Sequence, residues 1–141
     1  MTEGSYGSPD ALLEGRLRAL AEADFAQLYV SYHPDAPFLQ HFPAKQDYLN
    51  FAAQHLAEVS LVEWKLFAQR RCGTDTTEVL CWLRMDIGGE SQELYELALL
   101  ITSENGWSYH SAQKLTAEDY TGPVEKIDFR HFDNAEPKIR F

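Results

Sequence analysis

The spacing of apolar residues changes near residue 60, and this change limits the folds that the chain can adopt. Before that point apolar side chains recur every three or four residues, most clearly from about Lys45 to Val59, as in a helix with one buried face. After it they alternate, as in VEWKLFA, and the stretches CGTDTT, GGES and SENG are typical turns between strands. The sequence therefore predicts an α+β domain, with three N-terminal helices packed on a meandering antiparallel sheet of about four strands.

The domain boundaries follow from composition and helix-start signals. Residues 1–7 are polar and glycine-rich, so we expect a disordered leader there. Ser8 and Pro9 then form a good helix start. We expect the domain to span residues 8–120. Residues 121–141 form a tail or arm with strand-like pieces but no clear core face.

The charge of the chain argues against several classes of partner. Twenty-two acidic residues outnumber 12 basic ones, giving a net charge of −10, which repels nucleic acids and anionic membrane surfaces. We find neither the pattern of a signal peptide nor an apolar run long enough to cross a membrane. Cys72 and Cys81 have no zinc or disulfide spacing. These features predict a cytoplasmic protein with no bound metal.

Short motifs in fixed order resemble the YchJ-type middle domain, a branch of the nuclear-transport-factor-2-like or cystatin-like superfamily. The stretch ALLEGRLRALAEADFAQLYVSYHP resembles the opening of that domain, with Arg16 near the arginine pair of the family and Tyr32-His33-Pro34 at its aromatic-His-Pro motif. Glu96 precedes Trp107-Ser108-Tyr109 by the interval found in the family. The resemblance covers roughly residues 9–115.

This resemblance implies a cone-shaped fold in which a curved sheet and helices enclose a pocket. The chain lacks the Cys-Pro-Cys-Gly zinc motif that often flanks the domain, so zinc-linked roles are not implied. The family has no settled activity, and the resemblance indicates a fold and a pocket rather than a reaction. No cofactor is implied.

Two histidines, His33 and His41, lie in the proline-rich segment between the expected helices. His33 would be a general acid or base at the mouth of the cone, or a helix-end residue bonded to the backbone. A metal site would need a third ligand, and the nearby Asp35 does not complete a known ligand spacing. The pattern therefore favours a pocket or structural role for His33 over metal binding.

Glu96 lies on an otherwise apolar strand face, which is costly for a carboxylate unless it is paired or protonated. One interpretation is an ion pair with Arg16 that fixes the first helix on the sheet, and the other is a catalytic base at the pocket floor. We favour the ion pair. The residues expected to line the pocket are Tyr29, Tyr32, His33, Phe38, Trp64, Glu96, Trp107 and Tyr109.

The opposite face of the predicted sheet is also apolar, so something must cover it. We predict a homodimer through this face; the expected interface residues are Leu80, Trp82, Tyr95, Leu97, Leu99 and Ile101. Alternatively, the tail segment VEKIDFRHF folds back over the same surface.

Two function classes remain open from the sequence. The leading hypothesis is a non-catalytic, dimeric domain that binds a small molecule or assembles with a partner. The alternative is a small lyase, isomerase or cyclase-like enzyme that uses His33, Glu96 and Tyr109, by analogy with cone-fold enzymes.

Overall fold

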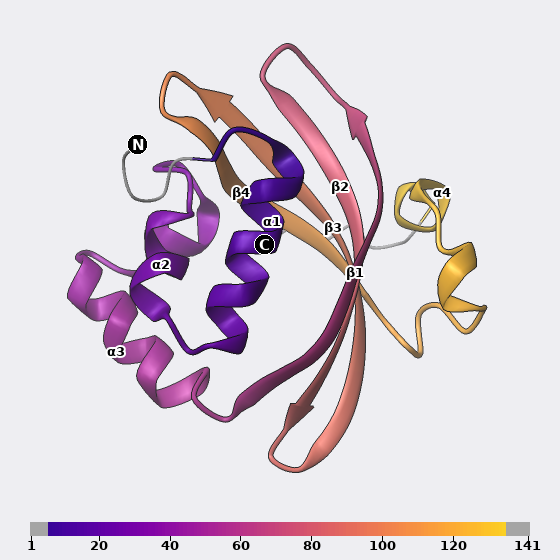
Figure 1. Ribbon diagram of the computed structural model, residues 1–141, viewed down its shortest axis with the longest axis horizontal. Coiled ribbons are helices and arrows are strands. Elements are labelled where there is room, and N and C mark those ends of the chain that lie inside the picture. The colour runs from indigo at the N-terminus through magenta and orange to yellow at the C-terminus, as the bar shows by residue number, and fades with distance from the viewer. Residues whose placement is uncertain (1–5, 135–141) are drawn as a thin grey trace.

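A four-stranded sheet forms the centre of the molecule, with helices on its concave side and a short C-terminal segment on the other (Figure 1). The computed structural model describes residues 6–134. In chain order the elements are α1 (Pro9–Ala21), α2 (Phe25–Val30), the 3₁₀ helix η1 (Pro37–His41), α3 (Lys45–His55), β1 (Val59–Arg71), β2 (Thr76–Ile87), β3 (Glu90–Ser103), β4 (Gly106–Thr116), the 3₁₀ helix η2 (Val124–Lys126) and α4 (Phe129–Asp133). Neighbouring strands are antiparallel in the order β1-β2-β3-β4. The predicted α+β class and antiparallel meander are confirmed.

Local signals explain where the first helices begin. The Ser8 hydroxyl accepts a hydrogen bond from the Ala11 N–H at 3.1 Å, and Pro9 occupies the first turn of α1. The carboxylate of Asp24 caps α2 by accepting from the Gln27 N–H at 3.2 Å. Since both caps satisfy amides that lack helical partners, they fix the starting points of the helices.

Bulges change the alternation that the sequence predicts for β1. The register of β1 against β2 shifts between Leu61 and Glu63, so Val62 stands on a bulge and is 46% exposed. Val62 was expected to share a face with Trp64, and that expectation is wrong.

At the β2–β3 hairpin, Gly88 and Gly89 have φ angles of +59° and +87°, which glycine adopts without strain.

The main core lies between the helices and the concave face of the sheet. α1 contributes its apolar stripe, and β2 and β3 contribute alternate residues from the facing side. The members of this core are Leu12, Leu13, Leu17, Leu61, Val79, Cys81, Leu83, Ala98, Leu100, Tyr109 and Ala112. A second cluster packs α2 and α3 together around Tyr48 and Ala52, which are 1% and 0% exposed.

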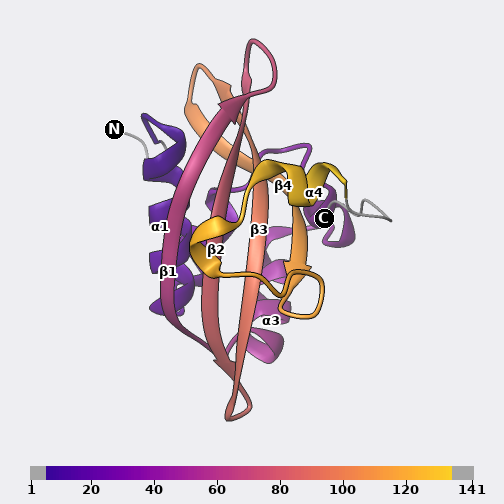
Figure 2. The same cartoon turned by 90° about the vertical axis from the view of Figure 1, so that its right-hand side faces the viewer.

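The tail covers the other face of the sheet, as Figure 2 shows. Ile127 and Phe132 pack there against four residues of the predicted dimer face, Leu80, Trp82, Tyr95 and Leu97, all buried within one chain. The alternative cover offered by the sequence, the tail segment VEKIDFRHF folded back over this face, is therefore the one that the structure shows. Leu99 and Ile101 are only partly buried. The homodimer itself stays a prediction.

The tail is helical where strand-like pieces were expected, with η2 and α4 in place of extended chain. Residues 135–141 lie outside the described part of the chain. So do residues 1–5 of the predicted leader, whereas Tyr6 accepts at its carbonyl from the Trp107 N–H at 2.9 Å. Within residues 6–134, the helices are too short or too polar to cross a membrane.

Candidate functional site

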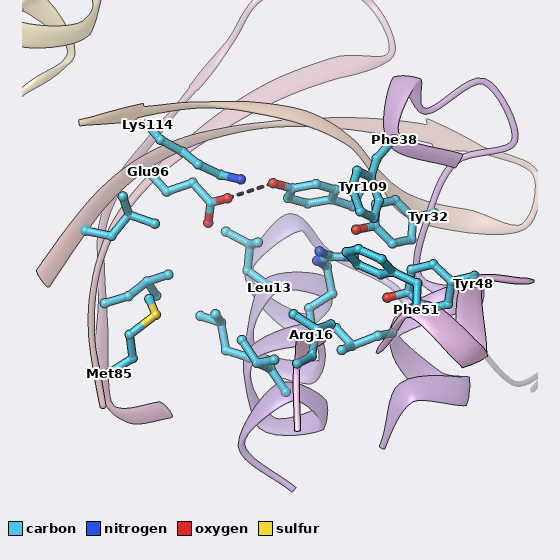
Figure 3. Close-up of a pocket in the computed structure, with 16 residues that line it drawn as sticks. Leu13, Arg16, Tyr32, Phe38, Tyr48, Phe51, Met85, Glu96, Tyr109 and Lys114 are labelled. Atoms are coloured by element: carbon cyan, nitrogen blue, oxygen red, sulfur yellow. Dashed lines mark hydrogen bonds between the residues drawn. The ribbon is translucent and has the colours of Figure 1, made fainter. Parts of the chain in front are cut away.

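A cavity of about 260 Å³ lies between the helices and the concave face of the sheet (Figure 3). Most of its wall is aliphatic or aromatic, and the polar groups converge from α1, β3 and β4. The lining residues are Leu13, Arg16, Leu17, Leu20, Leu28, Tyr32, Phe38, Tyr48, Phe51, Leu56, Leu83, Met85, Leu94, Glu96, Tyr109 and Lys114. An apolar cavity with a few convergent polar groups is the usual form of a small-molecule site.

The carboxylate of Glu96 is held by a tyrosine. The Tyr109 hydroxyl donates to Oε1 of Glu96 at 2.7 Å, and the Cys81 thiol lies 3.8 Å from Oε2. Glu96 is 7% exposed. Burial and the adjacent Glu96 carboxylate raise the pKa of Tyr109 well above 10.0, so the hydroxyl remains a donor at neutral pH. The buried carboxylate therefore has a strong hydrogen-bond partner that is not an arginine.

Arg16 does not form the predicted ion pair with Glu96. Within residues 6–134, no carboxylate oxygen lies within 4.0 Å of the Arg16 guanidinium nitrogens. The guanidinium carbon instead lies 3.7 Å from the ring centre of Tyr109 and 4.5 Å from that of Tyr32. Nη1 donates to the Ser31 hydroxyl at 2.7 Å. The interpretation of Arg16 and Glu96 as a structural pair is thus wrong in its contact, although both side chains do reach one cavity.

Burial lowers the pKa of Arg16, but the neighbouring Tyr32, Tyr109 and Glu96 outweigh that effect and leave the pKa above its ordinary value. Arg16 is therefore a fixed positive charge at the cavity wall. Contacts with aromatic faces stabilise such a cation. Because the rings cover its flat face, the N–H groups at its edge can still donate hydrogen bonds.

A bulge in β4 determines which of its side chains face the cavity. The register shifts between Leu99 and Leu100 of β3, so that Tyr109 pairs with Leu100 while Lys114 pairs with Glu96. An unbroken hairpin starting from Ser103↔Gly106 would place Gln113 opposite Glu96. Because one residue is inserted, both Tyr109 and Lys114 lie on the concave side. Figure 3 shows Lys114 and Glu96 extending toward Tyr109 from neighbouring strands.

The end of α2 is joined to β4 through backbone hydrogen bonds around Tyr109. The Tyr109 N–H donates to the Ser31 carbonyl, and the His33 N–H donates to the Tyr109 carbonyl, both at 2.8 Å. Tyr32 and Tyr109 form an isolated parallel bridge, with rings 5.6 Å apart. The Tyr32-His33-Pro34 motif therefore ends α2 and attaches it to the sheet, which sets the position of the two tyrosines that contact Arg16.

Four residues of the predicted pocket line the cavity, namely Tyr32, Phe38, Glu96 and Tyr109. The other four lie elsewhere, and the expectation that they line this cavity is wrong. Tyr29 packs on Tyr48, with ring centres 5.3 Å apart. Trp64 and Trp107 pack at the edge of the main core, and the Trp64 indole donates to Glu14 at 3.1 Å.

His33 is the fourth of these residues, and its ring is engaged outside the cavity lining. Its Nδ1 accepts a hydrogen bond from the Asp35 N–H at 3.0 Å, and its ring lies 6.3 Å from that of His110. His41 is exposed at the end of η1, with its ring 6.2 Å from that of Phe38. Among the described residues, no group of three or more His, Cys, Asp or Glu side chains is arranged to hold a metal ion.

Sequence reasoning missed Lys114, Tyr48 and Phe51 as lining residues. Tyr48 and Phe51 carried a signal, since they lie on the apolar face of the clearest helix. Lys114 carried none, because its side depends on the β4 bulge and a bulge leaves no reliable mark in the sequence.

Comparison with solved structures identifies the fold. The crystal structure of a ketosteroid isomerase-like protein from Erwinia carotovora atroseptica SCRI1043 matches with a TM-score of 0.59 over 76% of this chain and 92% of that chain, at 16% sequence identity. The chain has the nuclear-transport-factor-2-like fold. No family model and no curated protein matches its sequence. The nuclear-transport-factor-2-like fold places helices over a concave sheet, which is where the cavity of this chain lies.

The geometry permits binding and proton transfer at one place. Arg16 presents a cation, Glu96 a carboxylate and Tyr109 a protonated phenol, all at the wall of a mostly apolar cavity. The aromatic residues Phe38 and Phe51 line the same cavity, with ring centres 5.6 Å apart, and Phe38 stacks on Tyr32.

Proposed function

We propose that the protein is a non-catalytic domain of the YchJ-like type that binds one small, largely apolar molecule in the cavity under α1. The observation that supports this most is the cavity itself, with its apolar wall and the convergent groups of Arg16, Glu96 and Tyr109. Its volume is below the roughly 300–1,000 Å³ of pockets for drug-sized ligands, so the ligand is small. The order of the aromatic-His-Pro motif, Glu96 and Trp107 supports the YchJ-like assignment.

A cavity-filling substitution tests this proposal with 4-fluorobenzamide as a neutral aromatic probe. Binding is followed by the ¹⁹F NMR line width and shift during titration with protein. Leu94→Phe places a larger side chain into the cavity and should abolish the response. Leu66→Phe is the matched control, because Leu66 is also a partly buried leucine packed on the main core but does not line the cavity. Equal binding by both variants would contradict the proposal.

A catalytic function is the second candidate, and the bond between Tyr109 and Glu96 is the observation that favours it. A carboxylate and a phenol at a cavity wall can move a proton next to a carbonyl group. His33 is absent from the lining, so an acid–base pair would consist of Glu96 and Tyr109 instead of His33 and Glu96.

Hydrogen–deuterium exchange at the carbon next to the carbonyl of 4-fluorophenylacetone separates the two candidates. A binding domain leaves the exchange rate in D₂O unchanged, as seen by ¹H NMR. Acceleration that disappears in Glu96→Gln, while the probe still binds, would establish catalysis and overturn the non-catalytic proposal.

A further inference from the structure

The charges at the cavity wall oppose the charge of the whole protein. The chain carries a net charge of −10, yet the charged residues lining the cavity are two cations, Arg16 and Lys114, and one anion, Glu96. A small anion is repelled by the protein as a whole and would be attracted only where local groups outweigh that field. The cavity lining has a local excess of positively charged residues, as such a place requires.

Arg16 is the cation at the cavity wall whose guanidinium N–H groups can donate hydrogen bonds to an anion. Its guanidinium donates to the hydroxyl of Ser31 at 2.7 Å and also interacts with Tyr32. Within residues 6–134, no carboxylate oxygen lies within 4.0 Å of its guanidinium nitrogens. A guanidinium presents a fork of N–H groups that matches the two oxygens of a carboxylate, and its contacts with two aromatic rings hold the fork in place.

Glu96 does not cancel this attraction. Oε1 of Glu96 already accepts from the Tyr109 hydroxyl at 2.7 Å, and Lys114 lies directly across the strand pair from Glu96. Cross-strand residues of opposite charge offset one another. Arg16, which projects from α1 into the same cavity, thereby carries the excess positive charge.

We propose that the ligand is a small carboxylic acid with an apolar body, bound as its anion by Arg16 while its apolar part lies against Phe38 and Phe51. This inference rests on the proposed function of the cavity and specifies the chemistry of its ligand. The apolar wall supplies most of the contact area, and the charge-assisted hydrogen bonds to Arg16 supply selectivity for the acid.

A pair of near-isosteric probes, 4-fluorobenzoate and 4-fluorobenzamide, isolates the effect of the charge in ¹⁹F NMR titrations of the full chain at pH 7. We expect the wild type to bind the benzoate at least about tenfold more tightly, the ratio that a charge-assisted interaction gives over a neutral one. Arg16→Met should remove this preference by lowering the affinity for the benzoate at least about tenfold. Arg18→Met is the matched control, since Arg18 is an exposed arginine on the same helix whose nearest carboxylate is Glu14 at 3.9 Å.

The outcomes separate the two proposals. If the amide binds as tightly as the benzoate and Leu94→Phe abolishes both, the cavity binds ligands but the acid inference is wrong. If Leu94→Phe leaves both titrations unchanged, the cavity is not the site and both proposals fail. A tenfold preference that persists in Arg16→Met overturns the assignment to Arg16. If Arg16→Met does not fold, Arg16→Lys is the second variant, because it retains the positive charge without the fork of guanidinium N–H groups. We expect it to weaken benzoate binding several-fold. Unchanged binding would overturn the role of the guanidinium fork.

Discussion

Replacing Tyr109 by Phe removes the hydrogen bond of 2.7 Å that its hydroxyl donates to the buried carboxylate of Glu96. The ring stays in place, so the contact with Arg16 at 3.7 Å and the T-shaped contact with Tyr32 are retained. The substitution therefore tests one bond of 2.7 Å and little else. A hydrogen bond to a charged group contributes about 1.5–3 kcal/mol, and a buried acceptor left unpaired loses a similar amount. We expect Tyr109→Phe to lower the free energy of unfolding by about 2 kcal/mol.

Urea denaturation followed by tryptophan fluorescence measures this loss, and a thermal melt should show the midpoint fall by about 7 °C for a domain of this size. Tyr120→Phe is the matched control, because that hydroxyl makes an exposed bond to the neutral carbonyl of Pro123 at 2.6 Å. We expect the control to change stability by less than about 1 kcal/mol.

A double-mutant cycle assigns the effect to the pair. In Tyr109→Phe/Glu96→Leu both polar partners are gone, and replacing both by apolar groups is close to neutral. The double variant should therefore be more stable than the sum of the single effects by about 1–2 kcal/mol. Strict additivity, or a Tyr109→Phe variant within about 0.5 kcal/mol of the wild type, would refute the view that Tyr109 is what holds Glu96 in the cavity.

Three further predictions concern pH, the tail and self-association. Burial, aided by Glu96, raises the pKa of Cys81 above 9.0 and that of Tyr109 above 10.0, so the unfolded chain loses these protons at a lower pH than the folded chain. The urea midpoint should therefore stay constant below about pH 8 and fall as the pH rises above about 9. A midpoint that rises in that range would contradict the burial of both groups. Phe132 is 0% exposed under the sheet, so Phe132→Ala should lower the free energy of unfolding by about 3–5 kcal/mol in the same assay, and a loss below about 1 kcal/mol would show that α4 does not pack as described. Deleting residues 121–141 uncovers Trp82 and its neighbours, and light scattering at micromolar concentration should then show concentration-dependent association beyond that of the full chain, whereas equal masses would show that this face drives no assembly.

Periodicity predicted the fold class because each apolar face is a local property of its own segment. Alternation along β2 and β3 placed Cys81 and Leu80 on opposite faces, as the structure has them. It failed at α4, a helix of five residues that is too short to show a helical period and whose contacts with the sheet, such as the buried Phe132, are set by the tertiary fold. It also failed at Val62, where a bulge inserts one residue and reverses which face the following positions occupy.

The sequence predicted which residues lie at the helix–sheet interface, but not which of them contact one another. Arg16 and Glu96 were both expected on the helix–sheet interface, and both line the cavity. Opposite charges on facing elements give an opportunity for an ion pair, but the pairing depends on distances that a pattern does not contain. Here Tyr109 is close enough to satisfy Glu96 first, and the aromatic rings beside α1 stabilise Arg16 without a carboxylate.

The cover on the far face and the cavity on the concave face are connected through β4. The side-chain amide of Gln113 donates to the Phe132 carbonyl at 3.0 Å, and Leu115 belongs to the cluster under the tail. Lys114 stands between these two residues and faces the opposite way, toward Glu96. Because side chains alternate across a strand, Gln113 and Leu115 face the tail while Lys114, paired with Glu96, faces the cavity. The tail and the cavity therefore contact opposite sides of the same stretch of β4, beyond the bulge.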